Sequence, residues 1–213
     1  MKRFLETALK ILPLLAVALA APARGEEAAP DALVKAISDE VIATIRRDRA
    51  IQSGDPAKTA ALVETKILPH FDFAHTTRIA MGPNWRRATP EQQERLTREF
   101  RELLVRTYST ALTTYRDQKI DVKPLRARPA DTQVTVRTEV GQTGAQAVAI
   151  DYEMEKTADG WKIFDVRIAG ASLAATYRDT FAEAVRNRGV DGLIEMLSGK
   201  NRQNGARRAA AQT

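Results

Sequence analysis

An uninterrupted amphipathic stretch beginning at residue 89 is the feature that most constrains the fold. Thr89 suits the N-cap of a helix, Pro90 suits the first helical position, and Gln92 completes a capping box with Thr89. Apolar residues then recur at steps of three and four, at Leu96, Phe100, Leu103, Leu104, Tyr108, Ala111, Leu112 and Tyr115. A helix of roughly 26 residues would be about 39 Å long. Its apolar face therefore needs an equally long partner.

A run of alternating residues further along the chain predicts that partner. QVTVRTEV (133–140) and QAVAIDYEM (146–154) alternate apolar and polar side chains, and WKIFDVRIAG (161–170) follows a turn at ADG (158–160). KIDVKPLR (119–126) suits an edge strand. These segments predict a four-stranded antiparallel meander with its valine-rich face toward the long helix.

Helices are expected both before and after these strands in the sequence. One begins near Asp31, and a second has Asp55 as its cap and Pro56 in its first turn. A last helix begins near Ser172 and closes at Gly189, followed by a short one. The order predicts an α+β fold in which helices wrap an antiparallel four-stranded sheet.

The two ends of the chain differ in character from the body. Residues 1–23 carry Lys2 and Arg3, an apolar run and then small residues, which is typical of a cleaved secretory signal peptide. We expect a single domain over residues 24–199 and a basic, disordered tail over residues 200–213. The sequence has no cysteine, so a disulfide or a lipid attached to cysteine is excluded.

The net charge of +6 is confined to these ends. Residues 1–23 contribute +2 and residues 200–213 contribute +4, so the body is neutral. A neutral body lacks the basic footprint of a nucleic-acid-binding protein. We therefore expect no nucleic acid among the partners.

Few side chains are arranged for catalysis or metal binding. His70, Asp72 and His75 form the one histidine cluster, but a spacing of five places the histidines on different helix faces, and a partly exposed loop is the simpler interpretation. Asp151 and Asp165 are out of phase with the apolar strand positions and are predicted to point away from the interior. No nucleophile elbow, P-loop or dinucleotide fingerprint is present, so we predict no enzyme, no catalytic residues, no cofactor and no metal.

One surface patch suits protein recognition. Trp85, Arg86 and Arg87 lie together before the long helix, and tryptophan and arginine are enriched at interfaces. The alternative is that Trp85 packs the turn onto the body while the arginines are solvated. We carry these residues forward as candidate partner-binding residues.

Two long segments resemble the MlaC family, the phospholipid-binding auxiliary proteins of the Mla (toluene-tolerance, Ttg2-type) ABC transport system. They are FDFAHTTRIAMGPNWRRATPEQQERLTREFRELLVRTYSTALTTY (71–115) and WKIFDVRIAGASLAATYRDTFAEAVRNRGVDGLIEMLSGKN (161–201). The resemblance runs from about Leu33 to Asn201. AMGPNW (80–85) departs from it, because the family usually has a Leu-Gly pair there.

This resemblance implies a periplasmic phospholipid carrier that acts between an outer-membrane lipoprotein–porin complex and the inner-membrane Mla ABC complex. It also implies a cone-shaped arrangement of sheet and helices around an apolar pocket, with no catalysis, and we expect a monomer. Two alternatives stay open, namely a small-molecule enzyme on a similar cone-shaped fold and a non-lipid adaptor with a solid core.

The candidate lipid-binding residues come from the apolar faces of the predicted helices and sheet. A stripe of this kind describes a filled core equally well, since periodicity is the same in both cases. The candidates are Phe100, Leu103, Leu104, Tyr108, Leu112, Tyr115, Val136, Val148, Ile150, Tyr152, Phe164, Val166, Tyr177 and Phe181.

Overall fold

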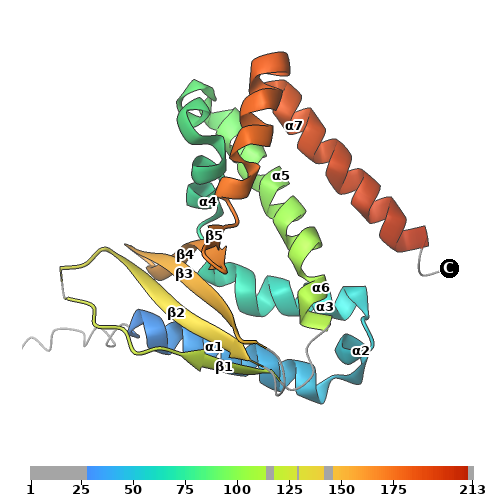
Figure 1. Ribbon diagram of the computed structural model, residues 1–213. Helices are drawn as coiled ribbons and strands as arrows, with labels where there is room; N and C mark the ends of the chain where they lie inside the picture. Colours follow the sequence, from blue (N-terminus) through green and yellow to red (C-terminus); the bar gives the residue numbers. More distant parts are fainter. Residues whose placement is uncertain (1–27, 114–117, 129, 142–145, 211–213) are drawn as a thin grey trace, which may run out of the picture.

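The computed structural model describes residues 28–113, 118–128, 130–141 and 146–210 (Figure 1). The predicted signal peptide, residues 1–23, lies outside these ranges, and so does Tyr115. A twisted antiparallel sheet forms one end of the molecule, and helices α4, α5 and α7 rise from it as a second layer (Figure 1).

The N-terminal helices run along the sheet. Helix α1 (Pro30–Arg47) is followed by the short α2 (Arg49–Gln52) and by α3 (Pro56–Leu62). Asp55 caps α3 as predicted, since its carboxylate accepts the N–H groups of Ala57 and Lys58. A π-helical turn η1 (Val63–Ile67) and a 3₁₀ turn η2 (Leu68–His70) continue α3 toward the sheet.

The segment after η2 is helical where a loop was predicted. Asp72 caps helix α4 (Phe73–Met81) by accepting the N–H of His75 at 2.8 Å. The 3₁₀ turn η3 (Gly82–Arg87) then leads to helix α5 (Pro90–Tyr108). The capping box of Thr89 and Gln92 is confirmed, with both of its hydrogen bonds formed.

Helix α5 is shorter than the sequence suggests. It has 19 residues and gives way at Ser109 to the short helix α6 (Thr110–Thr113). The Ser109 hydroxyl donates to the carbonyl oxygen of Val105, a local bond of the kind that bends helices. Uninterrupted apolar spacing therefore overestimated the length of this helix.

The predicted meander is confirmed, with one short strand added. The strands are β1 (Lys119–Val122), β2 (Gln133–Gly141), β3 (Val148–Thr157), β4 (Gly160–Ile168) and β5 (Ala171–Ser172). They pair in the order β1-β2-β3-β4-β5, all antiparallel, in an open sheet. The turn into β5 uses positive φ at Ala169 (49°) and at Gly170 (82°), which glycine adopts more easily than alanine.

The edge of β4 receives a second piece of chain beside β5. Phe71 forms a parallel bridge with Ile163, and the N–H of Asp72 donates to the carbonyl oxygen of Ile163 at 2.8 Å. The register slips by one residue between β3 and β4 next to Met154, leaving Phe164 as the extra residue. This edge therefore joins α4 to the sheet.

The last helix, α7 (Arg178–Ala210), follows the 3₁₀ turn η4 (Ala175–Tyr177) and breaks at Gly189, where φ is 70°. The break confirms the predicted closure at this glycine. The helix continues through residues 200–210, which corrects the prediction of a disordered tail from residue 200. Asn201 is 3% exposed and its amide donates to the carbonyl oxygen of Glu99, so the packed domain extends past residue 199.

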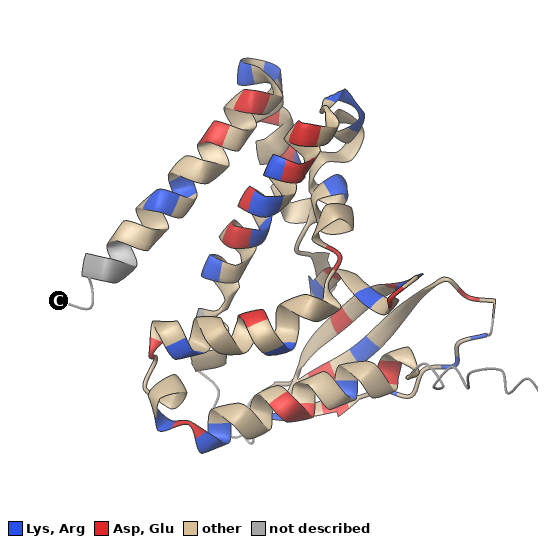
Figure 2. Cartoon of the chain, turned by 180° about the vertical axis from the view of Figure 1, so that it is seen from behind, with Lys and Arg blue, Asp and Glu red and all other residues tan. Residues whose placement is uncertain are grey.

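Among the residues that the structure describes, buried apolar side chains gather in three clusters. The largest joins α4, α5 and α7, and includes Leu96, Phe100, Phe181 and Leu193. A second lies between α1 and the sheet, and a third between α1, α2 and α3. Seen from behind, charged residues of both signs alternate along the outward faces of the helices (Figure 2).

Candidate functional site

In the described part of the chain, two apolar cavities lie between the sheet and the helices. The α5 cavity has a volume of about 270 Å³ and an almost wholly apolar lining. Its lining residues are Val63, Ile67, Leu68, Phe71, Phe73, Thr76, Leu104, Val105, Tyr108, Ser109, Ala111, Leu112, Ile150, Tyr152, Asp165, Val166, Ile168, Leu173 and Ala174.

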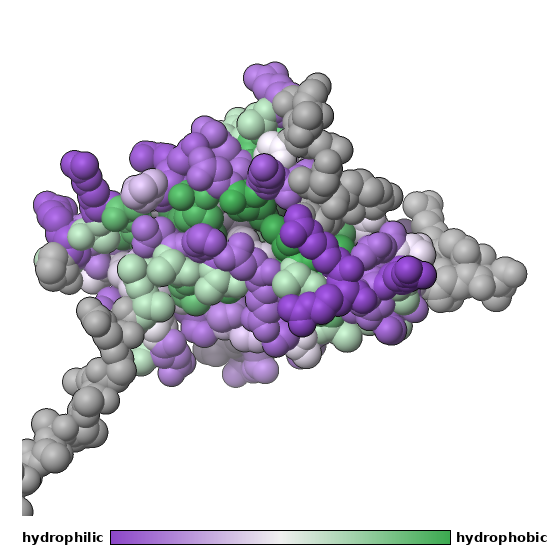
Figure 3. Space-filling view, turned by 90° about the horizontal axis from the view of Figure 1, so that it is seen from below, coloured by the Kyte–Doolittle hydropathy of each residue, from purple (hydrophilic) through white to green (hydrophobic). Residues whose placement is uncertain are grey.

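The second, the α1 cavity, lies against α1 and has a volume of about 390 Å³. Its lining residues are Val34, Ile37, Ser38, Val41, Ile42, Ile45, Ile67, Phe71, Ala111, Leu112, Gln118, Ile120, Val140, Ile150, Tyr152 and Ile163. Both cavities are partly open to solvent. Seen from below, hydrophobic residues reach the surface in a band between hydrophilic ones (Figure 3).

The alternation of side chains along the strands determines which residues of the sheet line both cavities. On β3, Ile150 and Tyr152 share the face opposite to Asp151, and Val166 lies beside Tyr152 on β4. On the helical side, α3 runs through η1 and η2 and brings Ile67 and Phe71 over this face. The cavities are therefore bounded on one side by the sheet and on the other by the bent helical segment that runs from α3 through η2.

Few polar groups interrupt the lining of the α5 cavity. Asp165 is 6% exposed, and its carboxylate accepts the N–H of Ala174 at 3.1 Å. The prediction that Asp165 points away from the interior is wrong, because the segment after β5 folds back along β4, with the N–H of Leu173 donating to the carbonyl oxygen of Val166. Asp165 thus holds this segment in the cavity wall.

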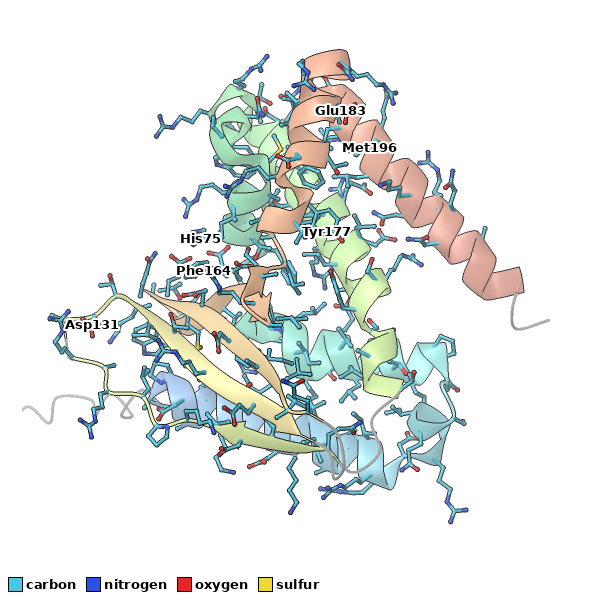
Figure 4. The ribbon with its side chains drawn as sticks, viewed as in Figure 1. His75, Asp131, Phe164, Tyr177, Glu183 and Met196 are labelled. Atoms are coloured by element: carbon cyan, nitrogen blue, oxygen red, sulfur yellow. The ribbon has the colours of Figure 1, made fainter. Side chains whose placement is uncertain are left out.

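The histidine cluster does not converge. His75 contacts Glu155 on β3, with 2.6 Å between Nδ1 and Oε1, and its ring stacks on Phe164 at 4.1 Å (Figure 4). His70 lies in η2, where burial lowers its pKa. Within the described ranges, no group of three or more histidine or acidic side chains is placed to hold a metal ion.

A tyrosine pair marks the border between the α5 cavity and the largest cluster. Tyr177 packs edge-on against Phe100, with 4.9 Å between the ring centroids, and also contacts Phe181. Burial, followed by the neighbouring Tyr108, raises the pKa of Tyr177 to about 12. The exposed fraction of Tyr108 is 36%, so this pair runs from closed core to cavity mouth.

The predicted lipid-binding residues fall into distinct places. Those that line a cavity are Leu104, Tyr108, Leu112, Ile150, Tyr152 and Val166. Those packed in closed clusters are Phe100, Leu103, Val136 and Phe181, with Tyr177 against them.

Three further candidates lie elsewhere. Phe164 stacks on His75, because the extra residue in β4 moves it out of the alternation. Val148 stands at the start of β3 and is 43% exposed. Tyr115 lies outside the described residues.

Several lining residues were missed by sequence reasoning. The largest omission is the bent segment after α3, whose ILPHF (67–71) was interpreted as a helix end and a loop. The second is the inner face of α1, including Ile37 and Ile42, which was predicted as helix without a role at a site. An apolar run that straddles a proline, as here at Pro69, was the available indication that this loop faces the interior.

The candidate partner-binding patch lies in η3, away from both cavities. Trp85 is partly buried against the largest cluster, and its carbonyl oxygen accepts the side-chain amide of Gln93 at 3.1 Å. Arg86 and Arg87 are exposed. The turn is thus stapled to the body by Trp85 while both arginines face solvent. Across the part of the chain described, no helix is both long and apolar enough to cross a membrane.

Comparison with known proteins gives consistent matches. The family described as MlaC protein matches residues 35–199. A solved structure from Ralstonia solanacearum, a phospholipid-binding protein in complex with a phospholipid, superimposes with a TM-score of 0.77. It is 44% identical to this chain and matches over 84% of this chain and 99% of that one.

Two curated relatives extend these matches. The intermembrane phospholipid transport system binding protein MlaC of Haemophilus influenzae is 23% identical over 174 residues, which are 80% of this chain and 81% of the relative. The toluene tolerance protein ttg2D of Pseudomonas putida is 26% identical over 192 residues, which are 90% of this chain and 85% of the relative.

Proposed function

The chain belongs to the MlaC family, and from that premise we propose that it is a periplasmic phospholipid-binding transport protein whose two cavities take the acyl chains. The observation that carries the proposal is the lining of the α5 cavity, which is almost wholly apolar and partly open to solvent. The resemblance to a protein solved with a phospholipid supports the same ligand class.

The energetics explain why such a cavity is useful. At about 0.8 kcal/mol per methylene, exposing two chains of roughly 16 carbons to water costs on the order of 25 kcal/mol. Unaided transfer between membranes is therefore slow. The two cavities, of about 270 and 390 Å³, lie near the lower end of the usual ~300–1,000 Å³ range of ligand pockets.

The finer parts of the proposal concern location and partners. The N-terminal pattern of residues 1–23 supports export, and the Mla and toluene-tolerance relatives support a periplasmic location. We assign the inner-membrane Mla ABC complex and an outer-membrane lipoprotein–porin complex as partners, and a monomer as the carrier. The exposed Arg86 and Arg87 beside the stapled Trp85 are the candidate contact for one of these partners.

We propose no catalytic role. The two groups with the most promising chemistry are engaged in structural contacts, His75 with Glu155 and Asp165 with the N–H of Ala174. The matching family is one of lipid-binding transport proteins.

Native mass spectrometry of the protein purified from a Gram-negative periplasm tests the proposal, with organic extraction of any bound molecule. We expect a discrete added mass that corresponds to phospholipid. A mass equal to the polypeptide alone, unchanged after incubation with phosphatidylglycerol vesicles, would contradict it. Leu112→Glu, which puts a charge into both cavities, should abolish the added mass, while Arg86→Glu at the distant patch should leave it unchanged.

A further inference from the structure

The last turns of helix α7 form a basic arm, residues 200–210. The arm contains Lys200, Arg202, Arg207 and Arg208 and no acidic residue, whereas residues 24–199 are neutral as a whole. Lys200 and Arg202 are exposed. The family match ends at residue 199, so the arm is an addition to the part of the chain that the family shares. Its largest apolar residue is alanine, so burial of apolar surface does not account for it.

Two contacts place the arm beside the end of helix α5. The side-chain amide of Asn201, a residue 3% exposed, donates to the carbonyl oxygen of Glu99 at 3.0 Å. Gly205 lies against the guanidinium of Arg106, where a Cβ atom would come within 3.4 Å of Nη1. The arm therefore stays in contact with α5 as far as Arg106, close to the exposed Tyr108 at the mouth of the α5 cavity.

A second basic region, the basic corner, lies where α1, α2 and α3 meet. Residues 44–58 contain four cationic and two acidic residues, and a polar hollow opens among them. Leu112 of α6 packs against the apolar cluster beneath this corner, so α6 connects the corner to the end of α5. The arm and the corner lie on the same side of the molecule in Figures 1 and 2. The exposed cations of the corner are Arg46, Arg47, Arg49 and Lys58.

We propose that the basic arm and the basic corner together form a docking surface for an anionic phospholipid bilayer. The choice of a bilayer rests on the proposed function, because a phospholipid carrier exchanges its cargo at a membrane. The two basic regions flank α6 and the end of α5. Contact through both of them therefore turns the mouth of the α5 cavity, marked by Tyr108, toward the lipid surface.

The attraction depends on cations held close to the bilayer. Each Lys or Arg near an anionic bilayer strengthens binding about fivefold, which corresponds to about 1 kcal/mol. The potential falls off over about 8 Å at physiological salt, so charges elsewhere on the molecule contribute little. In the corner, Asp48 partly neutralises Lys58, with 2.8 Å between Oδ2 and Nζ. The arm is therefore the main source of attraction and the corner adds to it.

The charge distribution favours a bilayer over a nucleic acid. A nucleic acid would need a basic footprint across the folded body, and residues 24–199 are neutral as a whole. An acidic protein would also attract the arm, but it would not use the nearness of the arm to the cavity mouth. An acidic protein partner is therefore an outcome that the test has to separate.

Sedimentation with vesicles tests the docking surface. The vesicles contain either phosphatidylcholine alone or phosphatidylcholine and phosphatidylglycerol in equal amounts. The arm variant combines Lys200→Gln, Arg202→Gln, Arg207→Gln and Arg208→Gln, which removes charge and keeps good helix formers. A control variant removes four exposed cations near the start of α5 and before the break in α7, away from the arm. It combines Arg95→Gln, Arg98→Gln, Arg186→Gln and Arg188→Gln.

We expect the unmodified protein to bind the phosphatidylglycerol vesicles, more weakly as salt is raised, and to leave the phosphatidylcholine vesicles unbound. The arm variant should bind at least about 25-fold more weakly, which is the loss of two charges at about fivefold each. The control variant should lose less than about fivefold. Equal losses in the two variants would assign binding to net charge and overturn the proposal. If the arm variant unfolds at lower temperature, Arg207→Gln with Arg208→Gln leaves the neighbours of Asn201 unchanged and should still weaken binding about fivefold or more.

A label on the arm tests the orientation. Because the chain contains no cysteine, a single thiol can carry a nitrobenzoxadiazole dye at one chosen place. Ala206→Cys puts the dye on the arm, and Glu183→Cys puts it at an exposed position near the opposite end of α7 (Figure 4). Addition of phosphatidylglycerol vesicles should raise the emission of the dye at residue 206 and leave that at residue 183 unchanged. Equal responses would contradict docking through the arm.

The outcomes separate this inference from the function beneath it. The arm variant should keep the added phospholipid mass in native mass spectrometry, because the arm lies outside both cavity linings. If the unmodified protein carries phospholipid but binds both kinds of vesicle equally, the inference alone is overturned and an acidic protein becomes the partner of the arm. If it carries no phospholipid but binds the anionic vesicles through the arm, the proposed function fails and the docking surface stands.

Discussion

The two halves of helix α5 share one apolar stripe but have opposite surroundings. In the first half, Leu96 and Phe100 are fully buried against α7, whose Leu193 and Leu197 are also fully buried. In the second half, Leu104 and Tyr108 line a cavity, and Tyr108 is 36% exposed. Periodicity decides which face of the helix turns inward, and the neighbouring element decides whether that face is filled or hollow.

The difference arises from where α7 leaves α5. Beyond Leu197, its contacts with α5 are small or polar, with Asn201 bonded to Glu99 and Gly205 beside Arg106. In Figure 1 the C-terminal part of α7 diverges from α5. The sequence of α7 after Leu197 contains no large apolar residue, so its last turns do not fill the space beside the end of α5.

Replacing the same residue type in the two halves is the strongest test of this comparison. Leu96→Ala, in the filled half, should lower the free energy of unfolding by about 2–5 kcal/mol. Leu104→Ala, in the half that borders the α5 cavity, should cost less than about 1.5 kcal/mol, because its side chain already borders open volume. Urea denaturation monitored by circular dichroism measures both. Equal losses would mean that the second half is as tightly packed as the first.

A second test concerns the segment that Asp165 holds in the wall of the α5 cavity. Asp165→Ala should destabilise the protein by about 1.5–3 kcal/mol, because the N–H of Ala174 loses a charged acceptor in a buried place. Asp165→Asn keeps an acceptor at nearly the same position and should recover much of that loss. Denaturant midpoints for the two variants give the comparison. Equal losses would show that the charge, rather than the hydrogen bond, stabilises the segment.

A smaller change in stability is expected when pH is raised, because of Tyr177, which lies between the α5 cavity and the largest cluster. Its folded pKa is raised to about 12, so both states keep the proton below pH ~10, the ordinary tyrosine value. Between pH ~10 and ~12 the unfolded state ionises first, and stability falls as pH rises. Since the side chain is half-buried, solvent screening reduces the loss to about 1 kcal/mol.

Thermal unfolding across this pH range measures that loss. Tyr177→Phe removes the ionising group and should flatten this part of the profile. A variant whose stability falls as steeply as that of the unmodified protein would assign the dependence to other groups, among them Tyr152, whose pKa is also raised.

The smallest change in stability is expected in the turn that follows Ile168, a residue that lines the α5 cavity. Ala169 has a φ of 49°, in the left-handed region that costs alanine roughly 1–2 kcal/mol. Ala169→Gly relieves this strain but adds freedom to the unfolded chain, so the net gain should be about 0.5 kcal/mol. The melting temperature should rise slightly. A decrease would show that the turn carries no strain at this residue.

Much of the fold could be predicted from local patterns. Thr89, Pro90 and Gln92 fixed the start of α5, and Gly189 fixed the break in α7, because these positions act through their own backbone. The meander followed from strand alternation and short turns. Such features depend on neighbours in sequence, which the sequence shows directly.

The cavities depended on contacts that lie far apart in the chain. Phe71 lines both cavities because it bridges to Ile163, some ninety residues later, and no local pattern contains that pairing. Phe100 and Tyr108 have the same place in the helical stripe, yet only Tyr108 lines a cavity. Alternation placed Asp165 on the outer face of β4, but it could not predict the chain folding back over it.

The short pieces of chain beside β4 also affect how the protein behaves at high concentration. An unpaired strand edge offers N–H and C=O groups on which another chain can add a strand and start aggregation. Here Phe71 and Asp72 occupy part of that edge and β5 occupies another. On the opposite edge, Lys123 forms ion pairs with Asp121 and Glu139 next to Pro124. These contacts leave less unpaired strand edge on which another chain could add a strand.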